Sequence, residues 1–249
     1  MSDFGIGWKT DANNMAISSE GYGLAYIGQA WSQGYYNRGP QTSPVCTAYA
    51  VNSMYMPLAF IEAPNNVMSR VVSINQISGS AWTVIVASIQ GLNVSTTTPV
   101  RYEPVVHVFA RLSVTAPAES WGLLVKDASG NRAWDSRENM LSARALIDWP
   151  AQNFSHGHEQ RQSYAYPSRI ARPAHCGFGI AGGESIIGRN AGKKQFYHTG
   201  GFRLDDGLLE RGVMVDSSGF YDDNINSQTP LNGSYQQECS IIIDVADYV

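Results

Sequence analysis

Charged residues are scarce in this chain, and neither sign of charge is concentrated in one stretch. Asp, Glu, Lys and Arg make up 15% of the 249 residues, the formal net charge is −4, and no run of Lys or Arg occurs. Nucleic-acid-binding surfaces carry clustered Lys and Arg, so we expect no nucleic-acid partner. No apolar run approaches the roughly 20 residues that span a bilayer, so we expect no membrane insertion. The start of the chain lacks a basic region followed by an apolar one, so we expect no secretory signal.

Cysteine is also scarce. The chain contains 3 cysteines, Cys46, Cys176 and Cys239, and they do not form the framework of a disulfide-rich secreted domain. In a chain made in the cytosol, we expect these cysteines to be free and half-buried. A disulfide between Cys176 and Cys239 is the alternative that the sequence leaves open.

The residues that the chain has in quantity are those of strands and turns. It contains 24 Gly and 13 Tyr, with many Ser, Thr, Asn and Val, and 43% of its residues are hydrophobic. This composition favours strands over helices. Two β-branched segments, residues 71–77 and 82–89, flank the turn formers Ser78-Gly79-Ser80 and predict a hairpin. In the second half we predict a corresponding hairpin over residues 195–204, with its turn at Gly200-Gly201.

The second half of the chain repeats the first. Residues 4–19 align without a gap on residues 121–136, and both segments open with an aromatic residue, a glycine and an aliphatic residue. Later segments recur in the same order: 25–31 with 143–149, 57–64 with 175–183, and 105–112 with 239–245. Turn signals every 8–15 residues are typical of antiparallel β-sandwiches. We therefore predict an all-β chain of two tandem antiparallel β-sandwich domains, Ig-like or jelly-roll-like, over residues 1–116 and 117–249, joined by a Pro/Ala connector at 115–119.

Two polar, aromatic segments, residues 29–44 and 152–166, are predicted to be exposed loops. Their aromatic side chains either pack back on the sheet or form a contact surface, since aromatic residues and Arg are enriched at the centres of interfaces. The candidate contact residues are Trp31, Tyr35, Tyr36, Arg38, Phe154, Tyr164 and Tyr166.

No pattern predicts a catalytic residue, a metal site or a cofactor site. Ser185 follows Gly182-Gly183-Glu184 but lacks the spacing of a Gly-x-Ser-x-Gly nucleophile loop. His156 and His158 have no further Cys or His at zinc-site spacing, so a solvated loop is the simpler interpretation. The Asp pairs 205–206 and 222–223 do not begin an EF-hand loop.

The second hairpin segment carries a family resemblance. Its Gly-hydrophobic strand, the turn Asp127-Ala128-Ser129-Gly130-Asn131 and the return Trp134-Asp135-Ser136 resemble the N-terminal signature of small tail-tip proteins of long-tailed bacteriophages. Residues 172–180 and 56–61 are similar to a later proline-flanked strand of those proteins. The first copy departs from the signature, because Ile17-Ser18-Ser19 replaces the triplet and its turn lacks the glycine. The resemblance implies a role that is structural and, in some members, host-binding, and no catalytic residue is carried over with it.

The repeat and the resemblance together predict a structural virion protein of a phage tail tip or baseplate, made in the host cytoplasm. Its partners would be other tail proteins and copies of itself. Tail tubes are sixfold and tail tips commonly threefold, so we favour a trimer, in which two like domains per chain form a pseudo-sixfold ring. The alternative is a receptor-binding head module whose exposed aromatic loops stack on sugar rings of a host-surface glycan. A third hypothesis, a hydrolase, has carboxylates such as Glu159 and Glu184 available, but nothing in the sequence fixes their separation.

Overall fold

The structure is a computed structural model. It describes residues 5–9, 14–18, 23–35, 46–65, 67–90, 100–112, 121–127, 129–155, 162–177, 181–187, 193–221 and 229–249. The described chain is nearly all strand, arranged in several antiparallel sheets, which confirms the all-β prediction. No helix among these residues is long and apolar enough to cross a membrane.

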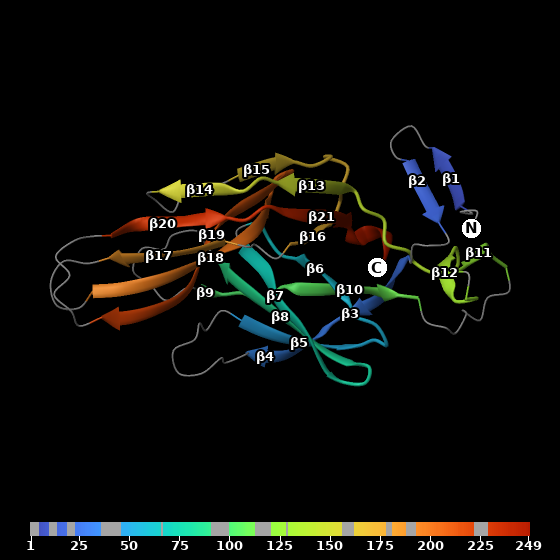
Figure 1. The fold of residues 1–249 in the computed structure, drawn as a ribbon, viewed down its shortest axis with the longest axis horizontal. Helices are drawn as coiled ribbons and strands as arrows, with labels where there is room; N and C mark the ends of the chain where they lie inside the picture. The colour runs from blue at the N-terminus through green and yellow to red at the C-terminus, as the bar shows by residue number, and fades with distance from the viewer. Residues whose placement is uncertain are drawn as a thin grey trace.

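A six-stranded sheet forms one layer of the molecule (Figure 1). Its strands, in spatial order, are β13 (Ala145–Trp149), β21 (Glu238–Asp244), β16 (Pro173–Cys176), β6 (Leu58–Glu62), β10 (Val105–Arg111) and β3 (Leu24–Gln29). A short 3-10 turn, η1 (Val245–Asp247), follows β21.

An eleven-stranded sheet forms the second layer. Its main path is β14 (Gln152–Ser155), β20 (Thr229–Tyr235), β17 (Ala181–Ile187), β18 (Lys193–Asp205), β7 (Val67–Ser78), β8 (Ala81–Gln90), β5 (Cys46–Asn52) and β4 (Trp31–Tyr35). Off this path, β19 (Leu208–Tyr221) pairs with β18 and β15 (Gln162–Ala165), and β9 (Val100–Arg101) pairs with β8.

Both sheets contain strands of both halves of the chain. In the six-stranded sheet, β3, β10 and β6 of the first half are followed by β16, β21 and β13 of the second. The sequence repeat makes β3 equivalent to β13, β10 to β21, and β6 to β16. Equivalent strands therefore follow in the same order when the sheet is followed inward from either edge. The halves meet where β6 pairs with β16, at Ile61 and His175, and where β7 pairs with β18, at Ser69 and Phe202. The halves are therefore joined edge to edge through equivalent strands.

The chain segment just before β13, at one end of the six-stranded sheet, also bonds to β3 at the other end. Ala25 of β3 forms an isolated antiparallel bridge with Met140, in the segment that leads into β13. The backbone N–H of Tyr26 donates to the carbonyl of Asn139 (2.8 Å), and the N–H of Leu141 donates to the carbonyl of Leu24 (2.7 Å). These bonds cover the edge of β3 and connect it to the segment that continues into β13, so we describe the layer as barrel-like.

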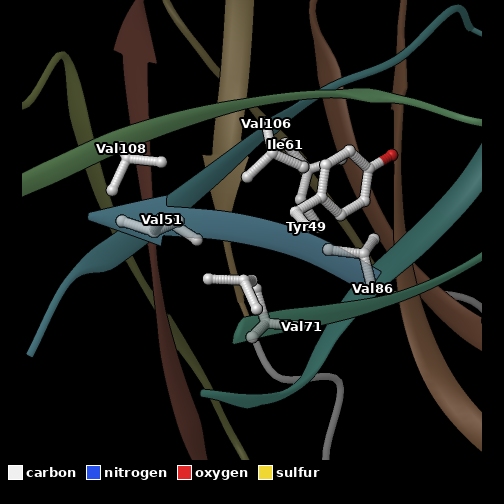
Figure 2. Packing of buried hydrophobic residues seen from close by; sticks show 9 residues of the cluster. Tyr49, Val51, Ile61, Val71, Val86, Val106 and Val108 are labelled. Atoms are coloured by element: carbon white, nitrogen blue, oxygen red, sulfur yellow. The ribbon is translucent and has the colours of Figure 1, made fainter. Parts of the chain in front are cut away.

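Two apolar clusters lie between the layers, and each is drawn from one half. In the first half, Figure 2 shows Val106 of β10 and Ile61 of β6 packed with Tyr49 of β5. In the second half, Trp149 of β13 and Ile242 of β21 belong to one cluster with residues of β18 and β19. Each half thus has its own sandwich-like core. The division into two tandem domains at residues 116 and 117 remains a prediction, because the sheets themselves are shared.

A third cluster lies on the other face of the six-stranded sheet and is common to both halves. It combines Phe60 and Phe109 of the first half with Ala174 and Ile243 of the second, all fully buried. Strand alternation separates the faces, since Ala59 belongs to the cluster between the layers and Phe60 to this one.

The predicted first-half hairpin is present, since β7 ends at Ser78 and β8 begins at Ala81. The prediction for the second half was wrong. Residues Gly200 and Gly201 lie buried within the continuous strand β18. The turn is formed instead by Asp206 (φ 34°) and Gly207 (φ 85°), the paired positive φ values of a tight hairpin turn.

The two segments that revealed the repeat both form two-stranded sheets: β1 (Gly5–Lys9) with β2 (Asn14–Ser18), and β11 (Leu124–Lys126) with β12 (Arg132–Asp135). Their registers differ. Gly7 pairs with Ala16, whereas Leu124, which aligns with Gly7, pairs with Asp135. The sequence alignment therefore gives the kind of element correctly but not its pairing.

Candidate functional site

The predicted contact residues Trp31 and Tyr164 both lie on exposed strands. Trp31 begins β4 and is 80% exposed, and Tyr164 lies in β15 and is 44% exposed. Both segments had been predicted as loops, and each contains strand structure instead. On the main path β4 is the last strand, whereas β15 pairs with β19, so the structure places these two side chains at separate edges of one sheet.

The other predicted contact residues fall into two groups. Tyr35 ends β4 and Phe154 lies in β14, so their backbones are placed, whereas Tyr36 and Arg38 lie outside the described residues. Tyr166 is half-buried against the second-half core. Its backbone N–H donates to the carbonyl of Gly207 (2.9 Å), and burial raises the pKa of its phenol. Tyr166 thus packs back on the sheet, as the alternative interpretation predicted.

Sequence reasoning missed several exposed apolar side chains. Met54 (68%), Met56 (60%) and Ile77 (65%) lie in the loop after β5 and near the tip of the β7–β8 hairpin, and Leu146 (68%) lies on β13. Leu146 alternates with the buried Ile147, which is a signal that the sequence pattern offered. The two methionines carry no comparable signal.

A polar network joins the two halves on the barrel face of the six-stranded sheet. Glu62 of β6 accepts two hydrogen bonds from Arg172, from Nε and Nη2, both at 3.0 Å. The Nε2 atom of His107 on β10 lies 2.8 Å from the same carboxylate. The Tyr26 hydroxyl lies 3.3 Å from His107 Nδ1. Glu62 therefore links a strand of the first half to an arginine of the second.

The protonation states in this network follow from its partners. Burial lowers the pKa of His107 and outweighs the opposite effect of Glu62, so the imidazole is neutral at pH 7. Burial alone would raise the pKa of Glu62, but hydrogen bonds from Arg172 and His107 lower it below its ordinary value. Because an ionised carboxylate only accepts, Nε2 carries the imidazole proton and Nδ1 accepts from Tyr26. Both ring nitrogens of His107 therefore have hydrogen-bond partners, and the network links the two halves through Glu62 and Arg172.

A second polar contact lies between the layers at the same junction. His175 of β16 is 1% exposed, and its Nε2 lies 3.1 Å from the hydroxyl oxygen of Ser69 on β7. Burial lowers the pKa of His175 to about 3, so this side chain is also neutral at pH 7. The ring of Phe202 lies against it, with centroids 5.6 Å apart.

The residues weighed for chemistry are not assembled into a site in the described part of the chain. No group of three or more His, Cys, Asp or Glu that could hold a metal occurs among the described residues. Glu184 and Ser185 lie within β17, and His156, His158 and Glu159 lie outside the described residues. None of the three cysteines is in a disulfide: Cys46 and Cys176 are buried, and Cys239 is exposed. Burial raises the pKa of the Cys176 thiol to about 12, which leaves it unreactive at neutral pH.

Comparisons of the chain with protein-family models, with curated proteins and with solved structures found no match.

Proposed function

We propose that this protein is a structural virion component of a phage tail tip or baseplate, which works by assembling with copies of itself and with neighbouring tail proteins. The proposal starts from the resemblance of residues 121–136 to the tail-tip signature. The observation that carries it is the exposure of aromatic side chains on strands, led by Trp31 at 80% on β4. Large exposed aromatic residues are characteristic of protein contact surfaces.

The proposal includes two tandem β-sandwich domains, residues 1–116 and 117–249, that descend from one duplicated unit. Equivalent strands meet at the junction, β6 with β16 and β7 with β18. This is the isologous contact of a two-fold dimer, made here within one chain. An isologous contact closes on itself, so it gives no support to a ring of six head-to-tail units. Three chains would instead supply three two-fold pairs around a threefold axis.

Native mass spectrometry of the purified protein and of isolated tails tests this proposal. We expect a trimer in both, together with labelling of the tail tip by an antibody raised against the protein. A monomer or a dimer in the virion would contradict the trimer, and labelling elsewhere than the tail would contradict the proposed location. The variant Trp31→Ala should weaken assembly, whereas Leu146→Ala, which removes an apolar side chain that is 68% exposed on the other sheet, is the matched control.

The same exposed ring supports a second candidate function, binding of a host-surface glycan or receptor. Exposed Trp and Tyr rings stack on sugars through the face of the ring. A glycan array probed with the intact protein tests this candidate. Binding that is lost in both Trp31→Ala and Tyr164→Ala, while the oligomeric mass is unchanged, would favour recognition over assembly.

A further inference from the structure

The two halves differ at the outer edges of the eleven-stranded sheet. The hairpins β7–β8 and β18–β19 are equivalent, since they meet at the junction through Ser69 and Phe202. Strand β5 pairs with β8, and β15 pairs with β19 in the same way. Strands β5 and β15 therefore occupy equivalent places, one in each half.

The described residues include a covering strand for only one of these two equivalent strands. Strand β5 has β4 on its outer side, paired at Trp31–Ala50 and Ser32–Tyr49. Among the residues that the structure describes, β15 has no strand on its outer side. Burial follows the pairing: Thr47, Ala48 and Tyr49 of β5 are buried, whereas residues 163–165 of β15 are exposed.

The strand that would cover β15 is placed elsewhere. Strand β14 follows β13 directly, as β4 follows β3, so β14 is the equivalent of β4. In the second half β14 pairs with β20, part of an extension in which β17 and β20 lengthen the sheet alongside β18. In Figure 1 this extension, with β14, β17 and β20, forms the end of the molecule opposite the β11–β12 hairpin. In the second half, the strand equivalent to β4 therefore pairs with β20 and not with β15.

Neither edge strand, as far as the structure describes it, carries a charged residue or a proline that would hinder pairing. Natural edge strands carry Lys, Pro, inward charges or bulges that prevent contact with other chains. Strand β15 reads Gln-Ser-Tyr-Ala, and β4 reads Trp-Ser-Gln-Gly-Tyr, so neither has a charge or a proline. The pairing of β4 with β5 shifts register after Ser32, and Gly34 has a φ of 82°. Only Trp31 and Ser32, at the start of β4, therefore keep a regular strand edge.

We propose that the β15 edge of one copy of this protein pairs, antiparallel, with the outer edge of β4 in a second copy. The contact continues the eleven-stranded sheet from chain to chain, as β4 continues it within the first half. It rests on the proposed self-assembly and names the surfaces that perform it. Because two different edges meet, the contact is heterologous, and three copies related by a threefold rotation would close it into a ring. Trp31 and Tyr164, one on each edge, flank it.

Site-specific crosslinking tests the pairing. Ser32 on β4 and Ser163 on β15 are both exposed, so each is changed to Cys in a Cys239→Ser background that removes the exposed thiol. The two variants are mixed as full-length proteins and treated with a short bismaleimide crosslinker. We expect crosslinked dimers in the mixture of Ser32→Cys and Ser163→Cys, and none when either variant is treated alone. Circular dichroism checks that both variants are folded.

Each other outcome has a defined meaning. Crosslinking of Ser32→Cys alone would indicate a β4–β4 contact and overturn the proposal. An oligomeric wild-type protein whose mixed variants do not crosslink would overturn the β4–β15 contact and leave self-assembly standing. A monomeric wild-type protein at all concentrations would overturn both.

An edge charge provides a second test that needs no thiol. The variant Ser163→Lys places on β15 the residue type that natural edges use against pairing. We expect self-association to weaken roughly tenfold or more, measured by sedimentation equilibrium. Ser78→Lys, on an exposed strand end at the β7–β8 tip, should leave association unchanged. Equal association of the two variants would overturn the proposal.

Discussion

At the scale of single residues, the junction between the halves depends on neutral histidines. His175 lies opposite Ile61 where β16 meets β6, and Ser69 lies opposite Phe202 where β7 meets β18. One side of each pair is polar and the other apolar. A neutral imidazole can be buried here because Ser69 satisfies one ring nitrogen, whereas a buried imidazolium would have no anionic partner beside Ser69 and Phe202.

The buried His175 makes stability depend on pH. Its folded pKa of about 3 lies below the ordinary value, so the unfolded chain takes up a proton that the folded chain does not. The free energy of unfolding should therefore fall as the pH drops from about 6.5 toward 3, and His107 adds to the fall in the same direction. His175→Leu should reduce this slope by up to about 1.4 kcal/mol per pH unit, measured by urea denaturation.

Ser69→Ala is the matched control for this prediction. It removes the hydrogen-bond partner of His175 without removing the group that titrates. We expect its free energy of unfolding to be lower at every pH, with the wild-type slope. Parallel curves for wild type and His175→Leu would contradict the assigned role of His175.

At this scale the sequence left exposure open and could not give partners. For Trp31 and Tyr164 it allowed either packing on the sheet or a contact surface, and in the structure both side chains are exposed. The bond between Glu62 and Arg172 spans 110 positions in the chain. No local pattern encodes such a distance, because it arises only when the two halves fold together.

At the scale of elements, hairpin turns decided which predictions succeeded. Ser78-Gly79-Ser80 is a single strong turn signal between two β-branched segments, and the hairpin forms there. In the second half, Gly200-Gly201 and Asp206-Gly207 compete. The Asp-Gly pair forms the turn because it supplies two positive φ values next to each other, while a buried double glycine is tolerated within a central strand.

The turn at Asp206-Gly207 should be sensitive to substitution in a specific way. Gly207→Ala places a Cβ on a residue at φ 85° and should cost about 1–2 kcal/mol of unfolding free energy. Asp206→Asn should change stability by less than about 0.5 kcal/mol, because Asn tolerates positive φ and keeps the oxygen that accepts from Asn65 (3.0 Å). Chemical denaturation measures both. Equal effects of the two variants would show that the turn conformation is not limiting.

At the scale of the whole molecule, the halves share one barrel-like layer. Phe60 and Phe109 of the first half and Ala174 and Ile243 of the second belong to the same buried cluster. The Glu62–Arg172 pair links the halves at the β6–β16 junction, and the bridge between Ala25 and Met140 links them at the β3 edge of the sheet. Neither half can unfold without exposing part of the core of the other.

Thermal unfolding should therefore occur in a single transition. In differential scanning calorimetry, we expect the van't Hoff and calorimetric enthalpies to agree, as they do for one cooperative unit. Arg172→Gln, which removes the partner of Glu62, should lower the midpoint without splitting the transition. Two resolved transitions in the wild-type protein would instead indicate two independent sandwiches joined by a linker.

The sequence repeat predicted that similar strand segments recur in the same order along the chain, but not how the copies combine. Similarity between residues 105–112 and 239–245 identifies β10 and β21 as equivalent strands. This similarity does not predict which strand edges of the two copies pair with each other. Edges pair through backbone N–H and C=O groups, which hardly differ from one residue to the next. The shared sheets therefore emerged only from the three-dimensional structure.

The shared barrel has a consequence for how the protein is made. During synthesis, β6 and β10 are complete before β16 and β21. Until then, Phe60 and Phe109 lack Ala174 and Ile243, the second-half residues of their cluster. Such an unfinished face is open to capture by chaperones or by neighbouring nascent chains. The interval between synthesis of the two halves is thus when aggregation competes most strongly with folding.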